Sequence, residues 1–214
     1  MKTWTARMLK KNPLMHALVL SIFSSALATF SPPSFCEQKV TQENSYINVT
    51  LGDDRLQRLV TFAIPSRYHP ETHGNFFRIV VDYPSMKPTT GPRSGKLDED
   101  SLDIVVNPYP RNGTIADKVI DGTYGAKKTG AEEGYDIYRQ PMGSSPPVKT
   151  FVYKDNNGNN VIIEDPGTWS IRYQLTRGEK PSYLIRCAFS KRLNANFREI
   201  DVATSKLISS MFVR

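Results

Sequence analysis

Short stretches in which apolar and polar residues alternate fill most of the chain after residue 45, and turn-forming residues end each of them. In residues 75–83 (NFFRIVVDY), Phe77, Ile79 and Val81 fall on one face of an extended chain, because successive side chains of a strand point to opposite faces. This alternation predicts antiparallel strands with one buried and one solvated face. Further strands are expected at 46–51, 56–64, 101–106, 134–140, 150–154, 161–164, 170–176 and 182–190.

Two turn sequences join neighbouring strands into hairpins. The first, DNNGNN at 155–160, is rich in Asn and Gly, which adopt the positive φ angles of a tight turn. The second, RGEKP at 177–181, precedes the last expected strand. Residues 114–121 fit either a strand or one to two helical turns. The stretches 84–100 and 121–147, the latter around the strand at 134–140, are expected to form long polar loops, and such loops are usually functional or disordered.

The C-terminal segment has the pattern of an amphipathic helix. Asn196 is a suitable N-cap, and Glu199 lies three residues later, where a capping-box partner belongs. Apolar residues then recur at helical spacing and predict a face that closes over the buried side of the sheet. They are Phe197, Ile200, Ala203, Leu207, Ile208, Met211 and Phe212.

These elements together predict an α+β fold, in which a mainly antiparallel sheet of about six to eight strands is covered by a C-terminal amphipathic helix. Their order over the last two thirds of the chain resembles small secreted domains of the PsbP/Mog1 type. The resemblance is one of layout alone, and a shared layout does not by itself imply a function.

The first 28 residues have the layout of a cleaved secretory signal peptide. Four basic residues precede an apolar run at 14–27, and Ala26-Leu27-Ala28 forms a small-x-small cleavage site. The run is shorter than the roughly 20 residues of a membrane-spanning helix, and no later segment approaches that length. The sequence therefore predicts a signal peptide at 1–28, a flexible lead-in at 29–45 and a single α+β domain at 46–214, located in the periplasm or secreted.

Cleavage near Ala28 would change the charge and the expected partners. The full chain has 28 basic and 21 acidic residues, a net charge of +7, and without the four basic leader residues the balance is 24 against 21, or +3. Nucleic-acid binding requires clustered basic residues on one face, and the basic pairs at 127–128 and 191–192 are not interleaved with aromatic residues. We therefore expect no nucleic-acid partner.

Cys36 and Cys187 are the two cysteines of the chain. In an oxidising compartment an even count favours a disulfide, so we expect these two residues to pair. The alternative is two free thiols, with Cys187 a small core residue. A catalytic role is not expected for Cys187, which lies in the middle of a predicted strand.

His69 and His73 have the H-x3-H spacing found in zinc sites. That spacing places both rings on one side of a helix, but Pro70 lies between them and Pro65 and Gly74 bracket the segment. We therefore expect an exposed loop here, with neither a metal site nor a cofactor.

No catalytic motif stands out. The sequence contains no GxSxG, P-loop or dinucleotide fingerprint, and we expect no catalytic residues. The main hypothesis is an exported, non-catalytic protein-binding domain, for example an immunity protein or inhibitor that blocks a secreted toxin or effector acting in the periplasm. Its contacts are expected on loop residues of types favoured in interfaces, namely Arg93, Arg111, Tyr124, Tyr135, Tyr138 and Arg139.

Two alternatives follow from weaker features of the sequence. The first is a secreted metal-dependent hydrolase that uses His69 and His73. The second is a cell-envelope assembly or lipid-binding factor that holds its ligand between the sheet and the C-terminal helix.

Overall fold

The computed structural model describes residues 45–53, 58–89, 98–143, 145–193 and 195–213. The predicted signal peptide, the lead-in up to residue 44, Cys36 and Arg93 lie outside the described residues. None of the described helices is long and apolar enough to cross a membrane.

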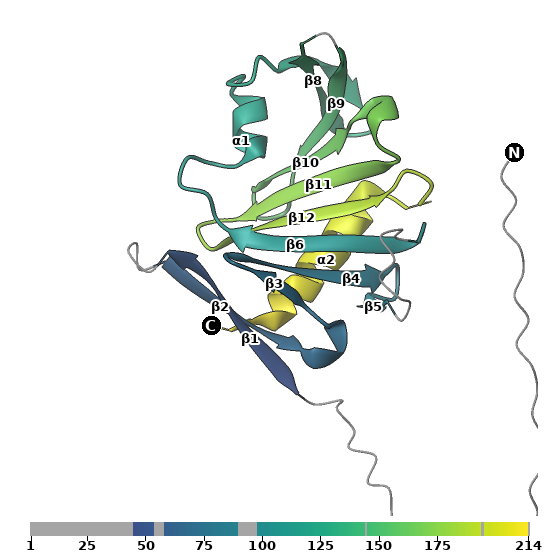
Figure 1. Cartoon of the computed structure of the whole chain (residues 1–214). Coiled ribbons are helices and arrows are strands. Elements are labelled where there is room, and N and C mark those ends of the chain that lie inside the picture. The colour runs from purple at the N-terminus through teal and green to yellow at the C-terminus, as the bar shows by residue number, and fades with distance from the viewer. Residues whose placement is uncertain (1–44, 54–57, 90–97, 144, 194, 214) are drawn as a thin grey trace, which may run out of the picture. The chain divides into compact units, whose positions relative to one another are not determined.

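The described strands form two antiparallel sheets, which confirms the predicted α+β fold (Figure 1). The prediction of one sheet with about six to eight strands was wrong, since the described residues form sheets of three and ten strands. The smaller sheet has the order β1 (Tyr46–Asp53), β2 (Arg58–Pro65) and β13 (Phe212–Val213). The larger sheet has ten strands, with β5 (Lys87–Pro88) beside β4. Its order is β3 (Glu71–His73), β4 (Phe76–Asp82), β6 (Ser101–Pro108), β12 (Tyr183–Ser190), β11 (Arg172–Glu179), β10 (Asn160–Asp165), β9 (Ser145–Lys154), β8 (Tyr135–Met142) and β7 (Lys127–Glu132).

The path of the chain through the larger sheet contains one long crossing. After β6 the chain passes through helix α1 (Ile115–Ile120) to β7 at the far edge, then returns strand by strand until β12 pairs with β6. The predicted turn at 155–160 closes the β9–β10 hairpin. There the Asp155 carboxylate accepts the N–H groups of Asn157 (2.9 Å) and Asn159 (2.8 Å), and Gly158 has a φ of +78°.

Four segments expected to be loops contain strands: β3 in the loop expected around His69 and His73, β5 in the loop expected at 84–100, β7, and the start of β9. Residues 127–132 form β7, an edge strand whose side chains are all exposed, so the apolar alternation that marks half-buried strands is missing. Strand β9 begins at residue 145 rather than 150. Its Pro146 and Pro147 lie where the β8–β9 register shifts, and such irregular positions tolerate proline because the regular hydrogen bonding is interrupted there.

The helix α2 (Phe197–Met211) covers one face of the larger sheet (Figure 1). Ile200, Ile208 and Met211 are buried against the sheet, as the periodicity predicts. Asp201 and Thr204 are buried as well, which the apolar stripe did not indicate. The Asn196 side chain caps the helix, as expected, but it accepts the N–H of Arg198 (2.8 Å) rather than that of Glu199.

The small sheet lies on the same side of the larger sheet as α2. Phe62 of β2 packs edge-on against Phe77 of β4 and Tyr183 of β12, with each pair of ring centroids 5.1 Å apart. Helix α1 covers the opposite face, where its Ala116 and Val119 form a separate apolar cluster that includes Val152 and Ile162. Residues on both faces of β9 and β10 are therefore buried.

Candidate functional site

The residues expected to contact a partner are divided between the core and the surface. Tyr135 of β8 is buried. Its ring lies 5.5 Å from that of Tyr153 and 5.9 Å from that of Phe197, at the start of α2. Tyr138 is half-buried against the α1 cluster, whereas Arg139 is exposed on the opposite face of the strand. These three residues of β8 therefore lie in different environments, and they do not form one exposed surface.

Two other predicted contact residues flank α1. Arg111 is exposed in the turn after β6, and Tyr124 is exposed in the turn after α1. The Lys118 ammonium lies 5.6 Å from the centre of the Tyr124 ring. Tyr124 thus keeps an accessible ring, while Tyr135 contributes to the packing of α2.

The two histidines lie on separate local structures. His69 follows the short 3-10 helix η3 (Ser66–Tyr68) in a left-handed conformation, with a φ of +45°. His73 belongs to β3, and its ring lies 5.5 Å from that of Phe76. Both side chains are exposed. Among the residues that the structure describes, no group of three or more His, Cys, Asp or Glu side chains is placed to hold a metal ion.

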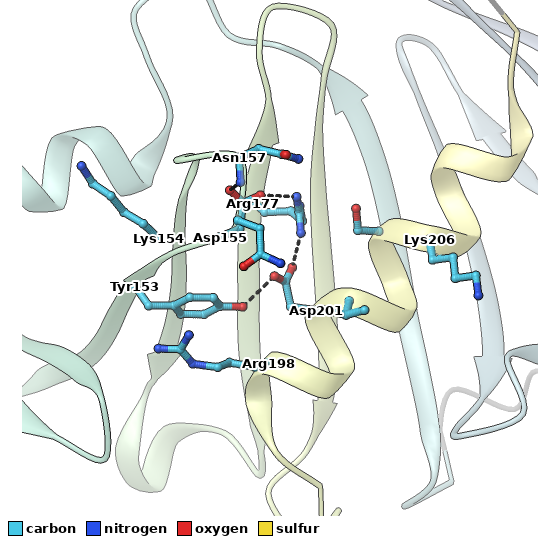
Figure 2. A pocket seen from close by; sticks show the side chains of 11 residues that line it. Tyr153, Lys154, Asp155, Asn157, Arg177, Arg198, Asp201 and Lys206 are labelled. Carbon is cyan, nitrogen blue, oxygen red and sulfur yellow. Dashed lines mark hydrogen bonds and ion pairs between the residues drawn. The ribbon is translucent and has the colours of Figure 1, made fainter.

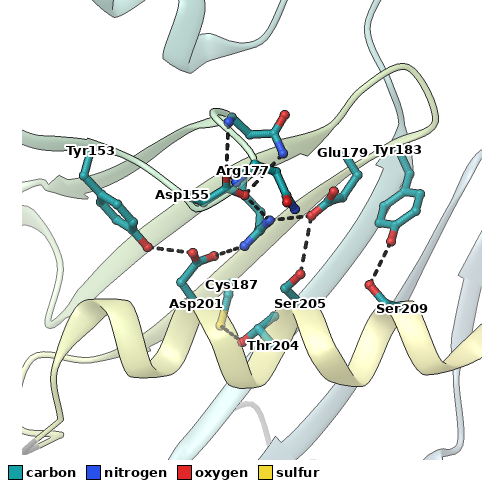
Figure 3. A network of polar contacts seen from close by, with 12 residues as sticks. Tyr153, Asp155, Arg177, Glu179, Tyr183, Cys187, Asp201, Thr204, Ser205 and Ser209 are labelled. Atoms are coloured by element: carbon teal, nitrogen blue, oxygen red, sulfur yellow. Dashed lines mark hydrogen bonds and ion pairs between the residues drawn. The ribbon is translucent and has the colours of Figure 1, made fainter.

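A buried arginine forms the centre of the polar network that fastens α2 to the sheet (Figure 3). Arg177 of β11 is only 5% exposed and lies on the core face of its strand, two residues after Leu175. Its guanidinium donates to carboxylates of three elements: Asp201 of α2 (2.9 Å), Asp155 of the β9–β10 turn (2.7 Å) and Glu179 of β11 (2.5 Å). The Tyr153 hydroxyl donates to the second oxygen of Asp201 (2.6 Å).

The protonation states and hydrogen bonds of this network suit a structural role. Burial, together with the charge of Asp201, raises the pKa of Tyr153, so its hydroxyl stays protonated and keeps donating. Burial also raises the pKa of the nearby Cys187 thiol to about 12, and a thiol that stays protonated is a poor nucleophile. Asp155, Asp201 and Glu179 all accept hydrogen bonds from Arg177, and these bonds hold the turn, the strand and the helix together.

Sequence reasoning missed this network, although the sequence carries a signal for it. Arg177 lies within β11 rather than in the turn expected at 177–181, at a position where the alternation calls for an apolar side chain. Asp201 interrupts the buried stripe of α2 next to Ile200. A charged residue is almost never fully buried unless it is paired. One buried cation and one buried acid on facing elements therefore indicate an ion pair.

An exposed apolar surface lies where β10 passes into β11. Trp169, at the end of the 3-10 helix η4 (Gly167–Trp169), is 70% exposed, and Ile171 is 80% exposed. Ile171 also lines a groove of about 440 Å³, together with Arg172 and Arg192. We call Trp169, Ile171 and this groove the Trp169 surface.

The loop that carries the Trp169 surface is held by a lysine of the segment after β12. The Lys191 ammonium donates to the Asp165 carboxylate and to the Gly167 carbonyl (both 2.5 Å). The Lys191 N–H donates to the Ile171 carbonyl (2.9 Å). These hydrogen bonds therefore hold the backbone that carries Trp169 and Ile171. The sequence pattern did not indicate that Trp169 would be exposed.

No family model matches the sequence, and no curated protein matches it either. The structure is similar to that of an immunity protein of the Stenotrophomonas maltophilia type IV secretion system, with a TM-score of 0.55 and 12% sequence identity. The similarity covers 79% of this chain and 94% of that protein. At this identity the likeness establishes a shared fold.

Proposed function

We propose that this protein is an exported, non-catalytic protein-binding domain that acts as an immunity protein, blocking a secreted toxin or effector in the periplasm. The observation that carries the proposal is the Trp169 surface, where a large aromatic and a large aliphatic side chain are exposed together on a fixed loop. The fold shared with a secretion-system immunity protein supports the same role.

The physical reason lies in what these side chains would gain from a partner. Tryptophan is enriched among the few residues that dominate binding energy, usually in the centre of an interface that excludes water. A loop held in place before binding also loses less conformational entropy when the complex forms. Since Lys191 already holds the backbone of this loop, burial of Trp169 and Ile171 would contribute to affinity with little cost for ordering the backbone.

The test begins with capture of the partner. The protein, expressed with its own leader and purified from the periplasm, is used to capture proteins from a periplasmic extract of its source organism. A protein bound in stoichiometric amount is identified by mass spectrometry. It is then expressed in the periplasm of a test bacterium with and without the present protein. We expect toxicity alone and growth when both are present.

A matched pair of variants locates the contact. Trp169→Ala is expected to weaken the complex by about 2 kcal/mol or more, roughly thirtyfold in Kd. Tyr46→Ala removes an aromatic ring that is 62% exposed on β1 and should leave Kd unchanged. Both variants must keep the circular dichroism spectrum of the parent. The proposal is wrong if no stoichiometric partner is captured, or if Trp169→Ala binds it as tightly as the parent does.

A further inference from the structure

A second surface feature lies above the Arg177 network, between α2 and the β9–β10 turn. It is a pocket of about 330 Å³ whose lining includes Tyr153 and Arg177 (Figure 2). Figure 2 shows Arg198 beside the Tyr153 ring, whereas the side chains of Lys154, on the hairpin, and Lys206, on α2, point away from each other and from Arg177. Arg198 is therefore the basic side chain that lies closest to the Tyr153 side of the pocket.

The charges that line the pocket do not cancel. Four cations, Lys154, Arg177, Arg198 and Lys206, line the pocket with two carboxylates, Asp155 and Asp201, and Glu179 also pairs with Arg177, so four positive charges stand against three negative ones. Asp155 and Asp201 are both bonded to Arg177. Within the described part of the chain, no carboxylate pairs with Lys154, Arg198 or Lys206, so the excess positive charge belongs to the border of the pocket.

Arg198 is the cation of this border whose position is fixed. Its guanidinium lies 4.6 Å from the centre of the Tyr153 ring and 5.2 Å from that of Tyr135. One terminal nitrogen donates to the carbonyl of Gly134 (3.0 Å). The other N–H groups are left to bind a ligand, and a planar guanidinium held in one orientation suits the two oxygens of a carboxylate.

We propose that this pocket receives the carboxylate side chain of an Asp or Glu of the bound partner protein, with Arg198 as its contact and with the charges of Lys206 and Lys154 adding to the positive potential around it. The exposed Val202 also lines the pocket and offers apolar contact to the methylene groups of such a side chain. This inference rests on the proposed function and adds that the toxin surface facing α2 is acidic.

One partner can reach this pocket and the Trp169 surface together. Ile171 directly precedes β11, and Arg177 lies within this strand six residues later. Six residues correspond to about 20 Å of extended chain. An interface of ordinary size buries about 800 Å² on each partner, and a patch of that area spans such a distance.

The pocket can be tested without the partner. The purified protein, labelled with ¹⁵N, is titrated with glutamate blocked as its N-acetyl and N-methylamide derivative, and amide shifts are followed by NMR. We expect saturable shifts at residues 154–157 and 198–206, with Kd on the order of millimolar. Arg198→Met should raise Kd about tenfold, and Lys206→Met should raise it by a smaller factor, because the Lys206 ammonium acts only at a distance. The same titration with the equally blocked glutamine should produce no saturable shift at these residues.

Matched controls separate the pocket from general basicity. The Arg67 guanidinium also lies over a tyrosine ring, that of Tyr68 at 5.6 Å, but it is not part of the pocket. Arg67→Met should therefore leave Kd for the glutamate probe unchanged. The inference is overturned if the glutamine probe binds equally well, if Arg67→Met weakens binding as much as Arg198→Met, or if inorganic phosphate binds more tightly than the glutamate probe.

The second part of the test uses the captured partner protein. Arg198→Glu combined with Lys206→Glu should weaken capture of the toxin, and the affinity of the parent should fall as salt is raised. If the probe binds but this double variant captures the toxin like the parent, the pocket is not the contact. Failure of the proposed function has a different signature, since no toxin is captured by any variant while the NMR titration still reports the pocket.

Discussion

Removal of the buried guanidinium by Arg177→Met tests whether the polar network holds α2 to the sheet. The variant keeps a long side chain on β11 but leaves three carboxylates without their shared cation. Removing one partner of a buried ion pair typically costs about 3–5 kcal/mol. The cost falls mainly on Asp201, which is 2% exposed, while Glu179 at 21% has access to water.

A loss of this size is a large part of the stability of a domain. Folded domains are stable by about 5–15 kcal/mol, so Arg177→Met should unfold at a much lower urea concentration. The assay is urea unfolding followed by circular dichroism, with the free energy of unfolding obtained by linear extrapolation. Because Tyr153 can still donate to Asp201 in the variant, we expect a loss near the lower end of this range, about 3 kcal/mol.

An exposed ion pair provides the matched control. Arg192 pairs with Glu99 at 2.5 Å, with the two side chains 79% and 62% exposed. Exposed pairs contribute about 0–1 kcal/mol, so Arg192→Met should change the free energy of unfolding by less than about 1 kcal/mol. If Arg177→Met loses no more than Arg192→Met, the buried network does not stabilise the fold.

Three further substitutions, the first with a matched control, test local features. A Cβ on Gly178 would lie 2.8 Å from the Tyr109 ring and 3.0 Å from Thr114. Gly178→Ala should therefore lower the free energy of unfolding by about 1–3 kcal/mol, whereas Gly130→Ala, with no atom within 4 Å, should not. Burial raises the pKa of Asp117, but hydrogen bonds from Thr114 and Asn160 outweigh it, and the net pKa is lowered. Asp117→Asn should thus destabilise the protein at neutral pH, and the deficit should shrink as pH falls through the folded-state pKa. Burial raises the pKa of Glu164 more than the charge of Arg186 lowers it. Glu164→Gln should therefore stabilise the protein at neutral pH, with a gain that disappears below the ordinary pKa of glutamate; urea unfolding across this pH range measures both effects.

The fold was largely predictable because most strands bury one face. Alternation located β1, β2, β4, β6, β8 and β10–β12, and helical spacing located α2. The same reasoning failed for β7, whose side chains are all exposed, because an edge strand is held by backbone hydrogen bonds rather than by buried side chains. The early start of β9 was hidden by two prolines at an irregular position.

The candidate sites were less predictable because residue type does not determine exposure. A tyrosine suits a core as well as an interface, and Tyr135 lies in the core while Tyr124 is exposed. The Trp169 surface depends on Lys191, which holds the loop through Asp165 and Gly167, 26 and 24 positions earlier in the sequence. A pattern formed by a few neighbouring residues does not report such a contact.

The predicted disulfide between Cys36 and Cys187 requires access to a buried thiol, and thiol reactivity tests whether the disulfide forms. Cys187 is fully buried on β12, and its sulfur lies 3.8 Å from the Thr204 hydroxyl of α2. A bridge therefore requires the segment around residue 36 to reach the space beneath α2. Because burial raises the pKa of this thiol to about 12, a free Cys187 should not react with a thiol reagent while the protein is folded. If the cysteines pair, unfolding without reductant should also release no thiol, and the appearance of reactive thiols at that step would show that the bridge prediction is wrong.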